Sequence, residues 1–214
     1  MRGLLGILLI TLLLMYILAI VLIKIPLFEI RRVEVHGIRN NELKILKKEI
    51  HSLGRQLIFI PEEVFLKKIN KIFMNRFRDV EIKRSFSTEG IIVSINFYRR
   101  KAIAKVIREN ISTLLDNEGV IFYDENQNPL RTIYVKSKNQ FENNKSKIVK
   151  LVNLGEKIFV YKDKTEVFVK EKKIILPTLD FLSERKLLLL KEIGLMDKEV
   201  NEVDMRYERI ILLR

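Results

Sequence analysis

The chain of 214 residues contains no cysteine and only 2 histidines, 8 glycines and 4 prolines. The absence of cysteine excludes a disulfide framework, a thiolate zinc site and a cysteine nucleophile. His36 and His51 lie far apart in the sequence, without the short spacings of metal-binding histidine pairs. Because glycine and proline are scarce and 48% of the residues are hydrophobic, most of the chain is neither disordered nor a fibrous repeat.

Common catalytic motifs are also missing. The phosphate-loop patterns GxGxxG and GxxxxGKS/T do not occur, and neither does the nucleophile motif GxSxG. The segment from Asp124 begins like a calcium loop, but Pro129 replaces the required glycine and Val135 the final glutamate. Asp116 and Glu118 fall in a predicted tight turn, where aspartate commonly bonds its own backbone. We therefore expect a protein that is not an enzyme and that uses no metal, cofactor or small-molecule substrate.

A long apolar segment occupies the start of the chain. No charged residue lies between Arg2 and Lys24, and at about 1.5 Å per residue the helix would extend about 30 Å, the thickness of the bilayer hydrocarbon. This is longer than the core of a cleaved signal peptide, and no cleavage site follows. We predict a short tail at 1–2, a transmembrane helix at 3–23 and a linker at 24–27.

Basic residues outnumber acidic ones. Lysine and arginine number 40 against 27 aspartates and glutamates, which gives a net charge of +13. One interpretation is a solvated lysine-rich surface; a sharper one is that Lys24, Arg31 and Arg32 contact anionic lipid headgroups beside the membrane. The same three residues favour a cytoplasmic location for the rest of the chain, but large domains cross membranes largely regardless of charge.

Two patterns follow the apolar segment. The first, at 28–100, predicts a strand, two helices and two strands, which form a three-stranded sheet with both helices on one face. The second, at 101–214, predicts a mostly antiparallel β domain with a helix in its C-terminal half. The fold class is therefore α+β. Its predicted strands are at 28–37, 80–84, 91–98, 102–108, 112–115, 120–123, 132–135, 157–161, 167–170, 174–176, 200–207 and 209–213. Its predicted helices are at 40–53, 61–73 and 178–193, with an extended stretch at 56–60 and a polar loop at 136–147 in which a helix could begin near Lys145.

Four motifs occur in a fixed order after the apolar segment. They are VEVHG from Val33, DVEIKRSFSTEGIIVSINFYRRKAIAKV from Asp79, LDNEGVIF from Leu115 and VDMRY from Val203. In this order they resemble the FtsQ/DivIB family of bacterial cell-division proteins, which have one membrane helix, a POTRA domain and a β domain. The chain departs from the family pattern at Tyr98 and Lys101, where glutamate and proline are common.

The resemblance implies a non-enzymatic bitopic scaffold of the divisome, with the N-terminus inside and most of the chain outside the cytoplasmic membrane, at the division septum. It implies partners of the FtsB/DivIC type and the FtsL type, together with the septal peptidoglycan synthesis machinery, and no nucleic acid. Two alternatives remain open. One is a membrane-anchored POTRA protein of envelope assembly or secretion, and the other is a membrane-tethered nucleic-acid-binding protein, favoured by charge alone.

The end of the chain is the predicted partner site. A last strand at 209–213 would lie at a sheet edge, whose unpaired backbone groups can bind a partner strand. The family resemblance also implies docking beside this strand, with Tyr207 as an aromatic anchor and Arg206 as a charged contact. In the other interpretation Ile210 and Leu212 face the domain core and a loop covers the edge. The predicted site residues are Arg206, Tyr207, Arg209, Ile210, Ile211, Leu212 and Leu213.

Overall fold

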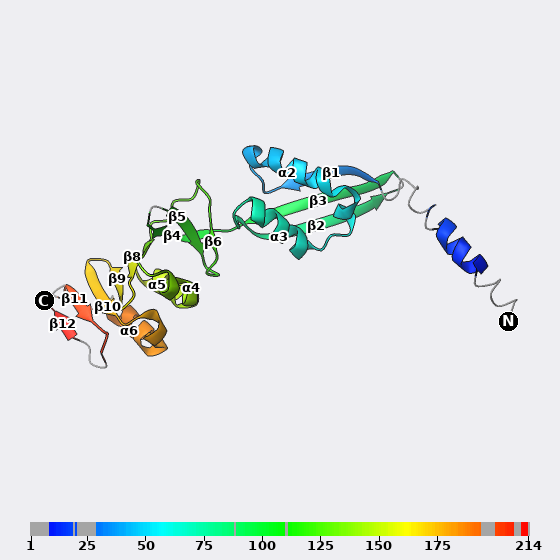
Figure 1. Cartoon of the computed structure of the whole chain (residues 1–214). Helices are drawn as coiled ribbons and strands as arrows, with labels where there is room; N and C mark the ends of the chain where they lie inside the picture. Colours follow the sequence, from blue (N-terminus) through cyan, green and yellow to red (C-terminus); the bar gives the residue numbers. More distant parts are fainter. Residues whose placement is uncertain are drawn as a thin grey trace, which may run out of the picture. The chain divides into compact units, whose positions relative to one another are not determined.

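The computed structural model describes residues 9–18, 20, 29–87, 89–109, 111–193, 200–207 and 211–213. The described chain divides into two compact units. The first unit extends to Ile72 and includes Phe77–Arg99, and the second comprises Phe73–Arg76 and the residues from Arg100 onward (Figure 1).

The predicted membrane segment at 3–23 lies partly outside the described residues. Within it, residues 9–18 and 20 are helical. No helix in the described ranges combines the length and the hydropathy that a membrane crossing needs.

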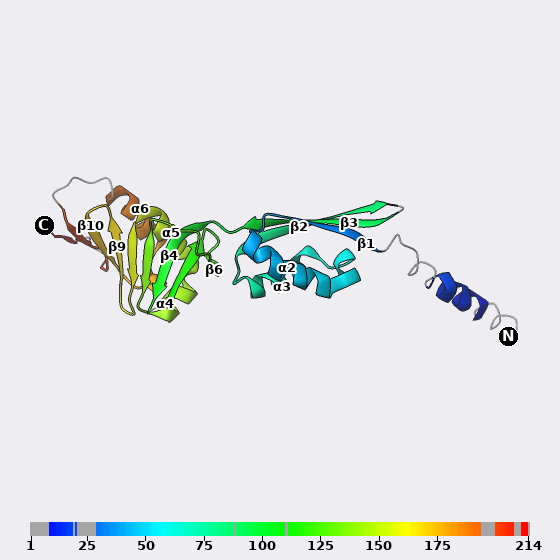
Figure 2. The ribbon, with the colours of Figure 1, turned by 90° about the horizontal axis from the view of Figure 1, so that it is seen from above.

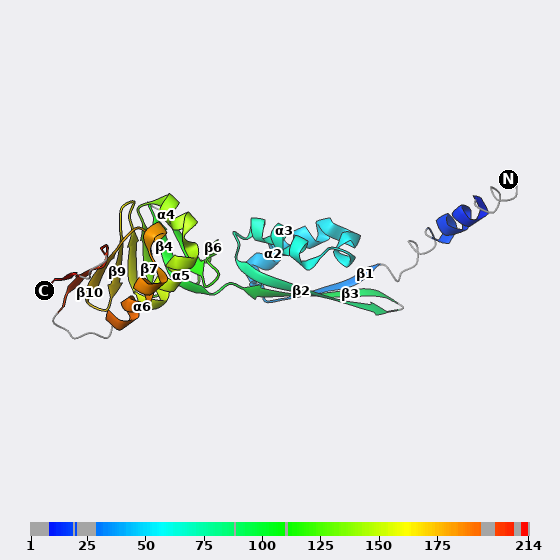
Figure 3. The same cartoon turned by 90° about the horizontal axis from the view of Figure 1, so that it is seen from below.

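The first unit is a sheet covered on one face by helices, as Figure 3 shows for α2 and α3. The sheet has the order β1-β3-β2, with β1 parallel and β2 antiparallel to the central β3. Phe65 and Ile69 of α3 and Ile95 of β3 are fully buried between the layers. The elements are β1 Ile30–His36, α2 Asn40–Leu53, η2 Gly54–Ile58, α3 Glu62–Ile72, β2 Phe77–Ser87 and β3 Gly90–Arg99.

Two local features of this unit follow from single residues. Gly37 ends β1 with a positive φ of 77°, and a Cβ at this position would overlap the carbonyl oxygen of Phe97. The predicted extended stretch at 56–60 is wrong, because Gly54–Ile58 forms a 3-10 helix. Its apolar residues Leu57 and Ile58 are buried, and a short apolar run of this kind does not distinguish strand from helix.

The second unit is built on a nine-stranded sheet with the order β12-β11-β10-β9-β8-β7-β4-β5-β6 (Figure 2). Buried residues of its strands and of α4, α5 and α6 form one hydrophobic cluster, so these helices pack against a single face of the sheet. The first elements are β4 Ala102–Arg108, β5 Ile111–Asp116, β6 Ile121–Phe122, β7 Thr132–Val135, α4 Lys138–Asn143, α5 Lys145–Leu154 and β8 Lys157–Val160. The remaining elements are β9 Thr165–Val169, β10 Lys172–Leu176, η3 Leu179–Phe181, α6 Glu184–Ile193, β11 Glu202–Asp204 and β12 Ile211–Leu213.

This sheet is mixed, and five of its eight joins are antiparallel, in agreement with the prediction of a mostly antiparallel domain. The joins β4–β7, β7–β8 and β10–β11 are parallel. Parallel neighbours need a crossover connection, and helices supply it: α4 and α5 lie between β7 and β8, and α6 lies between β10 and β11. The predicted loop at 136–147 therefore contains a whole helix, which Phe141 anchors in the core.

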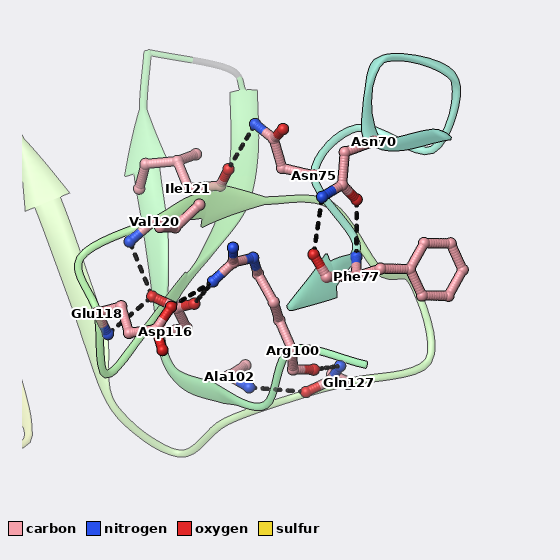
Figure 4. Close-up of polar contacts among 10 residues, drawn as sticks. All are labelled: Asn70, Asn75, Phe77, Arg100, Ala102, Asp116, Glu118, Val120, Ile121 and Gln127. Atoms are coloured by element: carbon pink, nitrogen blue, oxygen red, sulfur yellow. Dashed lines mark hydrogen bonds and ion pairs between the residues drawn. The ribbon is translucent and has the colours of Figure 1, made fainter. Parts of the chain in front are cut away.

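The turn after β5 is held by a buried carboxylate. One oxygen of Asp116 accepts hydrogen bonds from the backbone N–H groups of Glu118 at 2.9 Å and Val120 at 2.8 Å. The prediction that Asp116 bonds its own turn is thus confirmed. Arg100 forms ion pairs with Asp116 and Glu118, and Figure 4 shows its guanidinium directed at both carboxylates.

The start of the second unit is fixed by a side-chain amide. Gln127 donates to the carbonyl of Arg100 at 2.9 Å and accepts from the N–H of Ala102 at 2.8 Å (Figure 4). Asn75 donates to the carbonyl of Ile121 at 3.4 Å. The bonds of Gln127 attach the residues after Arg99 to the segment that follows β6, and the bond of Asn75 attaches Phe73–Arg76 to β6 itself.

Candidate partner-binding site

The strand β12 is the outermost strand of the second sheet among the described residues. It pairs antiparallel with β11, with Leu212 opposite Val203 and Ile211 opposite Asp204. The predicted site residues Arg209 and Ile210 lie outside the described residues. The backbone of 211–213 therefore forms a sheet edge, as expected from the sequence.

The chain bends after the short strand β11, which corrects the bounds of the predicted strand at 200–207. β11 ends at Asp204, and its carboxylate accepts a hydrogen bond from the backbone N–H of Arg206 at 3.0 Å. An aspartate that bonds the backbone two residues further on favours a turn. Arg206 and Tyr207 thus follow the strand and lie in a bend beside it.

Arg206 and Asp204 form a bidentate ion pair. The guanidinium Nη2 lies 2.7 Å from one carboxylate oxygen, and Nε lies 3.1 Å from each oxygen. These hydrogen bonds hold the pKa of Asp204 below its usual value, although burial of the carboxyl acts in the opposite direction. The same guanidinium carbon lies 5.5 Å from the ring centroid of Tyr207, whose side chain is exposed. Arg206 therefore positions the exposed ring.

A lysine of α6 fixes this bend from the other side. The ammonium of Lys186 donates to the backbone carbonyls of Met205 at 2.6 Å, Tyr207 at 3.1 Å and Arg206 at 3.3 Å. Met205 is fully buried, so the bend is also attached to the core. The sequence analysis missed Lys186, because only the tertiary fold brings α6 to residues 205–207.

Ion pairs between side chains join the strands next to β11. Lys173 of β10 lies 3.5 Å from Glu166 of β9 and 3.6 Å from Glu202 of β11, and Lys164 lies 2.7 Å from Glu166. Burial acts to raise the pKa of Glu166, but the hydrogen bond from Lys164 and the charge of Lys173 outweigh it and lower this pKa. Opposite charges on neighbouring strands stabilise their register. The contact between Lys173 and Glu202 thus links β11 to β10.

The predicted lipid-contact residues lie in the first unit. Arg31 forms an ion pair with Glu89, and Arg32 lies 3.2 Å from Glu34, with both arginine side chains exposed. Lys24 lies outside the described residues. Arg31 and Arg32 therefore have acidic partners within the chain that a lipid phosphate would have to displace.

The residues around β12 offer backbone groups to which a partner strand could bind. Within the described ranges, no group of three or more His, Asp or Glu side chains is placed to hold a metal ion. What the site presents is a sheet edge, an exposed aromatic ring and a bend fixed by Asp204 and Lys186.

One protein of Aquifex aeolicus (strain VF5) is 41% identical to the chain over 213 residues, which cover 100% of this chain and 99% of that protein. No family model matches the chain. The chain therefore belongs to one family with the Aquifex aeolicus protein, which is described as uncharacterized.

Proposed function

We propose that the chain is a non-enzymatic scaffold of the bacterial divisome, of the FtsQ/DivIB type. In this proposal residues 3–23 form a transmembrane helix, residues 28–100 a POTRA-type domain and residues 101–214 a β domain outside the cytoplasmic membrane. An FtsB/DivIC-type partner adds a strand to β12, and FtsL-type proteins and the septal peptidoglycan synthesis machinery assemble with it.

The edge position of β12 is the observation that supports this proposal most directly. Within the described residues, β12 pairs with β11 on one side and with no strand on the other. An exposed edge strand has unpaired backbone groups and promotes aggregation unless something covers it. A strand of a partner protein can cover the edge, because it forms backbone hydrogen bonds with it. The exposed ring of Tyr207, in the bend after β11, suits an aromatic anchor.

Two proline variants separate partner binding from folding. Successive N–H groups along a strand point to opposite sides, so Ile211→Pro and Leu212→Pro each remove one donor from a different side of β12. One variant weakens the pairing with β11, and the other leaves that pairing intact and removes an outward donor. We expect the variant with the wild-type thermal melt to lose co-purification with the FtsB/DivIC-type partner.

The control for this experiment is Ile111→Pro, at the exposed start of β5 on another part of the same sheet. It should retain co-purification with the partner. If both β12 variants retain the partner, strand addition at β12 is wrong.

The cellular role has separate tests. A reporter fused after Arg214 should be active only outside the cytoplasm, which would contradict the nucleic-acid alternative. A fluorescent fusion should gather at midcell, and depletion should give filaments. Normal division after depletion would favour the alternative role in envelope assembly or secretion.

A further inference from the structure

A second interaction surface lies in the first unit, between β1, α2 and the 3-10 helix η2. These elements enclose a groove of about 600 Å³. Ile30, Val33 and Val35 of β1 form one wall, and Ile50 and Leu57 form the other. The three β1 side chains are only half-buried, although their partners Ile50 and Leu57 are buried. The groove therefore leaves apolar surface of β1 open to a ligand.

The two edge strands of the first sheet, β1 and β2, differ in whether side chains bond their backbone groups. Side chains bond the backbone of the edge strand β2: Ile82 N–H donates to Glu62 at 2.7 Å, and Val80 N–H donates to Asp79 at 2.8 Å. Asn70 bonds both backbone groups of Phe77, at 2.8 and 3.0 Å (Figure 4). Side-chain caps of this kind protect an edge against a further strand.

The edge strand β1 has no such protection. Among the described residues, no side chain forms a hydrogen bond with the backbone of Ile30–His36, and β3 lies on its only paired side. The open edge runs beside the groove, so a strand added to β1 would also place alternate side chains against Val33 and Val35. Side chains on one face of a strand repeat every two residues, about 6.6 Å apart, which matches this pair.

The rim of the groove determines the chemistry of the ligand. Among the residues that the structure describes, Lys47, His51 and Arg55 line it together with one acid, Glu29. Arg55 and Glu29 are 3.6 Å apart, and their side chains are 55% and 63% exposed, so solvent screens this ion pair and a ligand carboxylate can replace it. The rim thus favours negative charge around an apolar floor.

We propose that the β1 edge and this groove bind an extended peptide segment of a partner protein, with alternating apolar and acidic residues. Its backbone pairs with β1, its apolar side chains enter the groove and its carboxylates lie near Lys47, His51 and Arg55. This site is independent of the proposed function, because it uses only residues of the first unit and no part of β12.

The test is peptide binding to the full chain in nanodiscs of neutral lipid. The probe is a fluorescein-labelled heptapeptide of alternating glutamate and valine, followed by anisotropy. One control peptide has lysine in place of glutamate and tests the charge. A second has serine in place of valine and tests the apolar floor without changing the protein. We expect saturable binding of the first peptide and binding weaker by about tenfold or more for each control.

A matched pair of variants locates the bound peptide. Lys47→Glu reverses a rim charge, whereas Lys48→Glu makes the same change about 100° around α2, away from the groove. We expect Lys47→Glu to weaken binding by about fivefold and Lys48→Glu to leave it unchanged. Methyl NMR signals of Ile30, Val33 and Val35 should shift on binding.

Three results would overturn the proposal. They are the absence of saturable binding, equal effects of Lys47→Glu and Lys48→Glu, and shifts confined to Ile211–Leu213. Self-association of the chain through the groove, detected by sedimentation and insensitive to the peptide, would show that a second copy is the occupant instead. None of these results affects co-purification through β12, so either proposal can be wrong while the other holds.

Discussion

The ammonium of Lys186 lies 2.6 Å from the backbone carbonyl of Met205 and joins helix α6 to the bend that precedes β12. The same group also reaches the carbonyls of Arg206 and Tyr207. One side chain thus satisfies backbone acceptors that no regular element pairs. We infer that Lys186 is a positioning residue, which holds the bend at Arg206 and Tyr207 in place.

Replacing Lys186 should therefore weaken partner binding more than it weakens folding. In Lys186→Met the aliphatic stem stays but the three hydrogen bonds are lost, with an expected cost of about 1–3 kcal/mol. Co-purification with the FtsB/DivIC-type partner should fall while the thermal melt persists. Lys191→Met, an exposed position on the same helix, is the control. Equal partner recovery from both variants would show that Lys186 does not position the site.

The stability of the second unit should fall in acid. Hydrogen bonds from Arg206 lower the pKa of Asp204 in the folded chain, so its contribution to stability is present above the usual aspartate pKa. That contribution is lost as the pH falls through the lowered value. Glu166, whose pKa is also lowered, acts in the same direction.

Urea melts from about pH 7 to about pH 3 measure this dependence. Asp204→Asn should make the free energy of unfolding less dependent on pH, because it removes the carboxylate whose pKa the ion pair lowers. An unaltered profile for Asp204→Asn would mean that its ion pair does not stabilise the bend.

Gly37 should tolerate no side chain. Its positive φ and the overlap of a Cβ with the carbonyl of Phe97 should together destabilise Gly37→Ala by more than about 2 kcal/mol. Gly54 also has a positive φ, of 50° with a ψ of −129°, but nothing lies within 4 Å of its Cβ position, so Gly54→Ala should cost only the backbone strain, about 1–3 kcal/mol, and less than Gly37→Ala. Urea melts of the full chain compare the two, and equal costs would show that the approach of Phe97 is unimportant.

The proposed membrane helix can be tested at its centre. Leu13→Arg should raise the free energy of insertion by about 2.5–3.5 kcal/mol and lower the amount of chain that resists carbonate extraction. Leu130→Arg makes the same substitution at a fully exposed position of the second unit and should remain membrane-bound. Unchanged extraction of Leu13→Arg would contradict insertion of the 3–23 segment centred near this residue.

The parts of the fold that the sequence predicted well carry a periodic apolar pattern. Alternation along β3 and the stripe of Phe65 and Ile69 in α3 both reflect burial of one face, so the three strands and two α-helices of the first unit were recognisable, although the 3-10 helix at Gly54–Ile58 was not. The helix α4 was missed because only Phe141 of its residues is buried, which leaves almost no pattern to detect. The parallel join of β7 and β8, which α4 and α5 bridge, is correspondingly hard to expect from the sequence.

The candidate site was predicted in part for a similar reason. The apolar run from Ile210 to Leu213 indicates a strand in the sequence, whereas the bend at Arg206 depends on the hydrogen bond of Asp204 and on Lys186. Lys186 looks like any surface lysine in the sequence. Contacts between residues distant in sequence leave no local signal, and an alternating pattern through VDMRY therefore suggested a strand that ends earlier in the structure.

Hydrogen exchange measures strand addition at β12 most directly, because it reports backbone hydrogen bonds. The full chain is compared with and without the purified FtsB/DivIC-type partner, with exchange followed at Ile211–Leu213 and, as an internal reference, at Thr132–Val135 of β7. The account predicts slower exchange at Ile211–Leu213 in the complex and unchanged exchange at β7. A complex that forms with unchanged exchange at Ile211–Leu213 would contradict it.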